Sequence, residues 1–173
     1  MSEIRIATLN DLKTLADIGK TTYITHFSSI WPVKEEMDTF LQKDFSLSAV
    51  QQSLTGTAST WFLAEEGKQA LGFAKVNWDS KIPASDLVGV ELQKIYFLPE
   101  ATGKGLGNRL FNKIEELAYE RKPPYLWLEV VQSNVAARTF YERQGLAVDH
   151  EKILKIGDNR IPMWVMVKKL AKA

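Results

Sequence analysis

One segment of the sequence combines a strand, a glycine-rich turn, an amphipathic helix and a second strand. The apolar-rich stretch at residues 88–98 leads into "ATGKGLGNRLFNKIEELAYE", where apolar side chains repeat at helical spacing over residues 105–120. The sequence Lys122-Pro123-Pro124 ends that helix, because proline has no backbone N–H to donate, and a short apolar strand follows at 125–130. A strand, a crossover helix and another strand are typical of parallel neighbours in one sheet. The segment therefore predicts parallel crossover connections in the middle of the fold.

The rest of the chain supplies further strands and helices around this segment. Asn10 is expected to cap the first helix, Trp31-Pro32 interrupts it, and residues 79–86 are expected to form a loop. Alternating or continuous apolar patterns predict strands, and 3.6-residue periodicity predicts helices. The expected strands are 4–7, 61–64, 71–76, 88–98, 125–130, 146–156 and 162–168, and the other helices are 35–41, 46–54, 105–120 and 134–144. This order predicts a mixed α/β (α+β) fold with an antiparallel first part.

Composition limits the class of protein. The 173 residues, 45% of them hydrophobic, fit one globular domain over 1–173. Lys and Arg number 22 against 21 Asp and Glu, so the net charge of +1 provides no bulk attraction to nucleic acid or to an anionic membrane. The chain has no cysteine, no cluster of metal ligands and no apolar run of spanning length. We therefore expect a cytoplasmic protein with no metal, nucleic-acid or membrane partner.

The three alternating glycines of the turn, Gly103, Gly105 and Gly107, indicate an anion site. A helix N-terminus leaves backbone N–H groups unpaired, and glycine lets a phosphate come close to them. The alternative is a turn that only needs positive φ. The spacing is neither that of a P-loop nor that of a dinucleotide fingerprint, whose third glycine would fall at Asn108. Glu129 could still imitate the ribose-binding acid of a nicotinamide fold.

A second segment, "SNVAARTFYERQGL" at residues 133–146, gives the turn a more specific meaning. Together with "LQKIYFLPEATGKGLGNRL" it resembles the GCN5-related N-acetyltransferase (GNAT) superfamily, which has a Q/R-x-x-G-x-G/A loop and a later N-x-x-A-x-x-F-Y helix. The resemblance covers residues 91–146, with Thr102 where the loop motif usually opens with Gln or Arg. It implies a central, mostly antiparallel sheet of about six to seven strands, flanked by helices and splayed at an acetyl-CoA site.

The resemblance also implies which residues bind acetyl-CoA. The strand backbone would pair with the pantetheine arm, the turn would hold the pyrophosphate with Lys104 and Arg109 nearby, and the second helix would contact the cofactor. The residues so implied are Ile95, Tyr96, Phe97, Gly103, Lys104, Gly105, Leu106, Gly107, Asn108, Asn134 and Tyr141.

Acetyl transfer to an amine needs a base and an acid. An alkyl ammonium of pKa about 10.4 is neutral at pH 7 only about once in 2,500 molecules, a penalty of roughly 4.6 kcal/mol that a general base can reduce. Glu91, on the strand leading to the turn, is the candidate base, with Glu129 or a water chain as the alternative. By resemblance Tyr141 is the general acid that protonates the departing thiolate. His26 and His150 lie outside both motifs.

The acceptor is less constrained by the sequence. The stretches "TTYITHF" and "MDTFLQKDFS" resemble bacterial polyamine acetyltransferases of the PaiA type, which implies a small-molecule amine. Acidic residues of the same region could hold a cationic substrate or form an ordinary solvated helix face: Glu35, Glu36, Asp38 and Asp44. A protein N-terminal or lysine acetyltransferase and a non-catalytic acetyl-CoA-binding module remain open. The apolar end strand "IPMWVMVKKL" could form a homodimer surface or part of the core.

Overall fold

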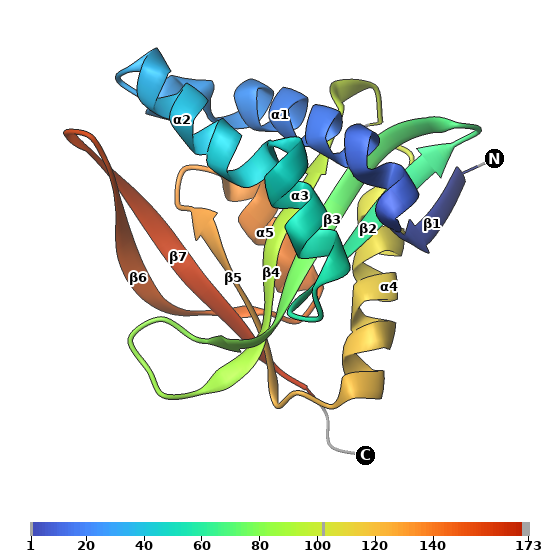
Figure 1. Ribbon diagram of the computed structural model, residues 1–173. Helices are drawn as coiled ribbons and strands as arrows, with labels where there is room; N and C mark the ends of the chain where they lie inside the picture. Colours follow the sequence, from blue (N-terminus) through green and yellow to red (C-terminus); the bar gives the residue numbers. More distant parts are fainter. Residues whose placement is uncertain (1, 102, 171–173) are drawn as a thin grey trace.

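The computed structural model describes residues 2–101 and 103–170 and contains a seven-stranded sheet in these segments (Figure 1). The strands are β1 (Ser2–Ile6), β2 (Ser59–Glu66), β3 (Gln69–Lys81), β4 (Val88–Phe97), β5 (Tyr125–Val131), β6 (Ala147–Ile156) and β7 (Asn159–Lys169). Their order is β1-β2-β3-β4-β5-β7-β6, and β4 with β5 is the parallel pair. All other neighbours are antiparallel. The predicted mixed, mostly antiparallel sheet is therefore confirmed.

Helices cover both faces of the sheet (Figure 1). On one face lie α1 (Leu12–Phe27), α2 (Lys34–Phe45) and α3 (Leu47–Thr55), and on the other lie α4 (Leu106–Arg121) and α5 (Val135–Arg143). Short 3-10 turns occupy Leu9–Asp11, Ser28–Ile30 and Pro99–Ala101. Apolar strand residues that point to alternate faces pack against both helix layers, so the sheet lies between two cores. Among the described residues, no helix is long and apolar enough to cross a membrane.

Two local predictions were wrong. Asn10 does not cap the first helix; instead Asp11 accepts the backbone N–H of Thr8 at 2.7 Å and pairs with Arg5 at 2.8 Å. The predicted loop at 79–86 begins later, because β3 continues to Lys81 through a bulge at which Asp79 adopts a φ of 54°. The sequence suggested a loop there because the segment contains Pro83, and the bulge interrupts the side-chain alternation by which a strand is predicted.

Candidate active site

Strands β4 and β5 separate along their length. The parallel pairing joins only Val90 with Leu126 and Glu91 with Trp127, and Figure 1 shows the strands diverging from there. On its other side β4 remains paired with β3 up to Phe97. The edge of β4 that faces β5 beyond Glu91 therefore has backbone groups with no strand partner among the described residues. An extended ligand could hydrogen-bond to them as an added strand does.

A bulge in β4 lies where this opening begins. Lys75 faces Lys94 and Val76 faces Leu92, so Gln93 has no partner on β3. The extra residue exchanges the faces of the side chains that follow, because strand side chains alternate. Beyond the bulge, Lys94 and Tyr96 face α1–α3, whereas Ile95 and Phe97 pack against the α4–α5 core.

The glycine turn lies at the end of β4, directly before α4. Gly103 and Gly105 have φ values of 82° and 69°, and a Cβ added at either position would meet nothing within 4 Å. Gly105 is the N-cap of α4, and the buried Leu106 anchors the first turn of this helix. The backbone N–H groups of that turn lie next to open space, which is the geometry that an anion needs. Thr102, where the sequence departs from the loop motif, lies outside the described residues.

Two cations predicted near the turn are paired with other groups. The Lys104 ammonium forms an ion pair with Glu66 of the β2–β3 hairpin at 2.8 Å. Arg109 donates to the Oγ and, at 3.2 Å, to the backbone oxygen of Ser2. The carboxylate of Glu66 therefore offsets the charge of Lys104, whereas Arg109, bonded to neutral groups, keeps its charge near the turn.

Helix α5 packs beside the start of α4. A Cβ on Gly107 would lie 3.5 Å from the Phe140 ring, and Gln144 donates to Asn108 at 2.7 Å. Asn134 caps α5 by accepting the N–H of Ala137 at 3.1 Å. The second sequence motif is thus adjacent to the glycine turn, as two parts of one binding site require.

Two tyrosines approach each other from the two layers. Tyr141 is half-buried on α5, and Tyr96 is half-buried against α1–α3. Burial raises the pKa of the Tyr141 phenol above its ordinary value; burial and then the nearby Tyr141 raise the pKa of Tyr96. Neither hydroxyl donates or accepts a hydrogen bond within the described part of the chain, and neither is a fully buried unsatisfied group. The Tyr141 phenol is therefore protonated at neutral pH and has no hydrogen-bond partner among the described residues.

Glu91 lies on the α1–α3 face, in the last registered pair of β4 with β5. Its Oε1 accepts from Asn77 Nδ2 at 3.0 Å and from Ser80 Oγ at 3.3 Å. The alternative base, Glu129 on β5, is in an ion pair with Lys152 at 3.0 Å. Of the two carboxylates, Glu91 has no ion-pair partner among the residues described.

The acidic residues of α2 differ in their surroundings. Asp44 pairs with the buried Lys94 at 2.7 Å, and Asp38 pairs with Lys34 at 2.8 Å. Glu35 and Glu36 are exposed in the first helical turn. Of these four acidic residues, Glu35 and Glu36 are the two that form no ion pair within the described segments.

Several residues near the opening were not predicted from the sequence. These are Asn77, Ser80 and Lys94, together with His26, whose ring stacks on Tyr96 with centroids 5.9 Å apart. An asparagine inside a strand pattern is the signal that could have identified Asn77, because strands are depleted in this residue.

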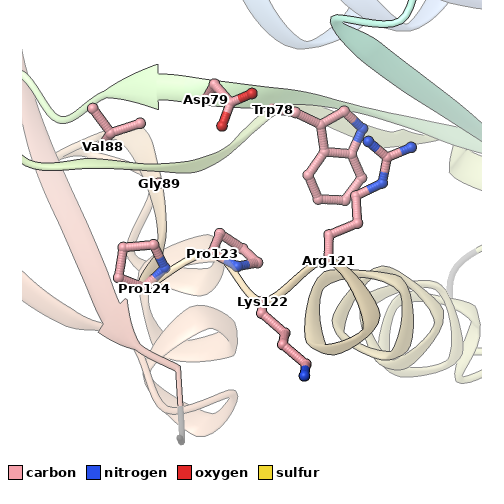
Figure 2. Close-up of a pocket in the computed structure, with 8 residues that line it drawn as sticks. All are labelled: Trp78, Asp79, Val88, Gly89, Arg121, Lys122, Pro123 and Pro124. Atoms are coloured by element: carbon pink, nitrogen blue, oxygen red, sulfur yellow. The ribbon is translucent and has the colours of Figure 1, made fainter.

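A cavity of about 420 Å³ lies elsewhere, at the beginning of β4 (Figure 2). Its wall includes Gly89, eight residues before Phe97 in the sequence and thus about 26 Å away along an extended strand. Figure 2 shows the Arg121 guanidinium beside the Trp78 ring, 4.3 Å from its centroid. This cavity is separate from the glycine turn. The described residues also include no group of three side chains suited to hold a metal ion.

Comparison with known proteins identifies the family. Residues 22–146 match the Acetyltransferase (GNAT) family, which is most of the chain. The chain belongs to this family. The predicted superfamily and the enzyme class, an acetyltransferase, are thereby confirmed.

Individual relatives are more distant. An uncharacterised N-acetyltransferase of Lactobacillus delbrueckii subsp. lactis is 27% identical over 161 residues, covering 92% of each chain. The peptidyl-lysine N-acetyltransferase YiaC of Escherichia coli is 26% identical over 117 residues, 68% of each chain. The structure of PaiA N-acetyltransferase from Thermoplasma acidophilum, in complex with coenzyme A, superposes with a TM-score of 0.76 at 20% identity, covering 98% and 99% of the two chains. This last similarity shows the shared fold.

Proposed function

We propose that this protein transfers an acetyl group from acetyl-CoA to a small primary amine by direct attack in a ternary complex. The observation that carries the proposal is the opening between β4 and β5, with the glycine turn at the end of β4 and Tyr141 on the adjoining helix. Family membership supports acetyl transfer, and the coenzyme A complex of the Thermoplasma protein supports the donor.

The donor would occupy the opening as an extra strand. The backbone of Ile95, Tyr96 and Phe97 would pair with the pantetheine arm, and the pyrophosphate would lie on the N–H groups of residues 103–108. Asn134 would add a polar contact from the start of α5, because its exposed side chain uses only Oδ1 for the helix cap.

The reaction then needs three proton transfers within the site, the formation of one bond and the cleavage of another. Glu91, directly or through water, takes a proton from the ammonium of the acceptor, and the neutral nitrogen attacks the thioester carbonyl carbon. The C–N bond forms, the C–S bond breaks, and the thiolate takes a proton from the Tyr141 hydroxyl. The acetylated nitrogen loses its second proton, which restores the phenol. The products are the amide, CoA thiol and one proton, which Glu91 releases to solvent.

The contacts of the β6–β7 hairpin with the α1–α2 connection support a small acceptor. Asn159, at the beginning of β7, donates to the backbone oxygen of Ile30 at 2.9 Å, and a Cβ on Gly157 would lie 3.2 Å from Pro32. The tip of the β6–β7 hairpin is therefore attached to the α1–α2 connection, which restricts the groove that a protein substrate would need. We propose a polyamine as the acceptor, with the exposed Glu35 and Glu36 as the charges that attract it. The name of the Escherichia coli relative favours a peptidyl lysine as the second candidate.

The test is thiol release from acetyl-CoA, followed with a disulfide dye. The chain has no cysteine, so the signal belongs to CoA alone. The acceptor panel contains spermidine, spermine, monoamines and lysine peptides, with each acceptor omitted in turn as the blank. Release that depends on spermidine or spermine is the expected result. Release only with peptides would replace the polyamine by a peptidyl lysine, and tight acetyl-CoA binding without release from any acceptor would indicate a non-catalytic binding module.

A further inference from the structure

We propose that Asn77 is a positioning residue for the reaction: it holds the Glu91 carboxylate with one oxygen fixed and the other free for the acceptor. The inference rests on the proposed function, in which Glu91 is the base. It begins from one row of residues across four strands, in which Ser59 faces Asn77, Asn77 faces Glu91, and Glu91 faces Trp127.

Hydrogen bonds along this row fix the orientation of the Asn77 amide. Ser59 Oγ donates to Asn77 Oδ1 at 2.7 Å, and the other end of the amide, Nδ2, donates to Glu91 Oε1 at 3.0 Å. A flipped amide would place its oxygen against the carboxylate and its NH₂ against the serine. The flipped form would face the acceptor-only carboxylate with another acceptor, whereas the Ser59 hydroxyl can donate or accept, so the Glu91 carboxylate determines which form is present.

A bulge in β3 supplies the second donor to Glu91. Asn77 faces Glu91, but Ser80 faces Gly89, so Trp78 and Asp79 together oppose the single residue Val90. The bulge, in which Asp79 has a φ of 54°, turns Ser80 to the same face as Asn77. A non-glycine residue with positive φ next to a reactive group is the kind of local strain that aims a side chain.

The two oxygens of the Glu91 carboxylate therefore have different surroundings. Both donors bind Oε1, and Oε2 makes no hydrogen bond with any residue that the structure describes. Glu91 also occupies the last registered pair before β4 and β5 separate. The free oxygen is thus placed where an acceptor amine would meet the thioester.

Kinetics of an Asn77→Leu variant test this role. Leucine keeps the number and branching of the asparagine side-chain heavy atoms and removes the donor, so we expect kcat to fall about tenfold while KM for acetyl-CoA stays within about twofold. The matched control is Thr60→Val. It removes a cross-strand bond between β3 and β2 on the opposite face of the sheet, from Trp78 Nε1 to Thr60 Oγ1 at 2.9 Å, and should leave kcat within about twofold.

A double-mutant cycle separates positioning from a general effect on the fold. In a Glu91→Gln background the Asn77→Leu change should lower kcat by less than about twofold, because the carboxylate it positions is gone. If Asn77→Leu lowered kcat by the same factor in the wild-type and Glu91→Gln backgrounds, or left kcat at the wild-type value, the proposal would be overturned. Wild-type turnover in Glu91→Gln would overturn it too, while acetyl transfer itself stands.

A measurement without turnover keeps the inference testable if no acceptor in the panel reacts. The Asn77 side-chain NH₂, assigned in NMR spectra by its absence in Asn77→Leu, should exchange with solvent several-fold faster in Glu91→Ala than in the wild type. Equal exchange rates in the two proteins would show that the bond to Glu91 does not persist in solution, and would overturn the proposal.

Discussion

Two glycine-to-alanine variants separate backbone strain from ligand contact at the glycine turn. Gly105 in the turn and Gly67 in the β2–β3 hairpin have φ values of 69° and 64°, and a Cβ on either would meet nothing within 4 Å. The left-handed conformation costs a residue with a Cβ about 1–2 kcal/mol. Each variant should therefore lose about 1 kcal/mol of unfolding free energy, a fall in Tm of about 2–4 °C for a chain of this size.

The affinity for acetyl-CoA should separate the two variants. At Gly105 the methyl group would occupy the open space next to the amides of α4, where the pyrophosphate is proposed to lie. Loss of one charge-assisted amide bond, about 1.5–3 kcal/mol, corresponds to roughly 10- to 150-fold weaker binding. Gly67→Ala should bind as the wild type does. Urea unfolding without ligand and calorimetric titration with acetyl-CoA measure the two effects, and equal affinities in both variants would refute the phosphate site.

Three further predictions concern other parts of the site. Tyr141→Phe should lower kcat about 100-fold with little change in Tm, as measured by thiol release; wild-type turnover would exclude Tyr141 as the acid. Asp44→Ala should lower the unfolding free energy by about 3 kcal/mol in urea titrations, because it leaves the 7%-exposed Lys94 side chain without its partner, and Lys94→Met in the same chain should restore much of it. Stability should fall as the pH rises above about 10, because the unfolded chain releases the phenol protons of Tyr96 and Tyr141 that the fold retains, by at most about 1.4 kcal/mol per pH unit for each. Urea titrations at about pH 8 and pH 11 check this, and the Tyr96→Phe variant should show a smaller decrease.

Most of the fold could be predicted because its signals are local. Periodicity identified the strands and helices, and the crossover helix between residues 105 and 120 predicted the parallel pair that β4 and β5 form. The capping role of Asp11 was missed although its signal is local, because Asp11 accepts the N–H of Thr8, three residues earlier, in a capping box. The continuation of β3 past Asp79 was missed because a bulge has no alternating pattern.

The parts of the site that could be predicted are those whose backbone geometry is set by residues close together in the sequence. The left-handed Gly103 and Gly105 and the cap by Asn134 follow from residues adjacent in sequence. The pairing of Lys104 with Glu66 and the bonds around Glu91 depend on cross-strand register. Register is set by packing of the whole sheet, so the order of residues along one strand does not reveal which side chains meet.

The two bulges explain how β4 can both offer its edge to acetyl-CoA and carry the proposed base, Glu91. In β4, the bulge at Gln93 turns Ile95 and Phe97 into the α4–α5 core and leaves the opposite edge of the strand free for a ligand backbone. In β3, the bulge beside Asp79 brings Ser80 to Glu91. Only a short regular stretch lies between the two irregularities, and Glu91 is within it. The separation of the strands that would admit acetyl-CoA therefore begins next to the carboxylate that would deprotonate the acceptor, which places both substrates at one point of the sheet.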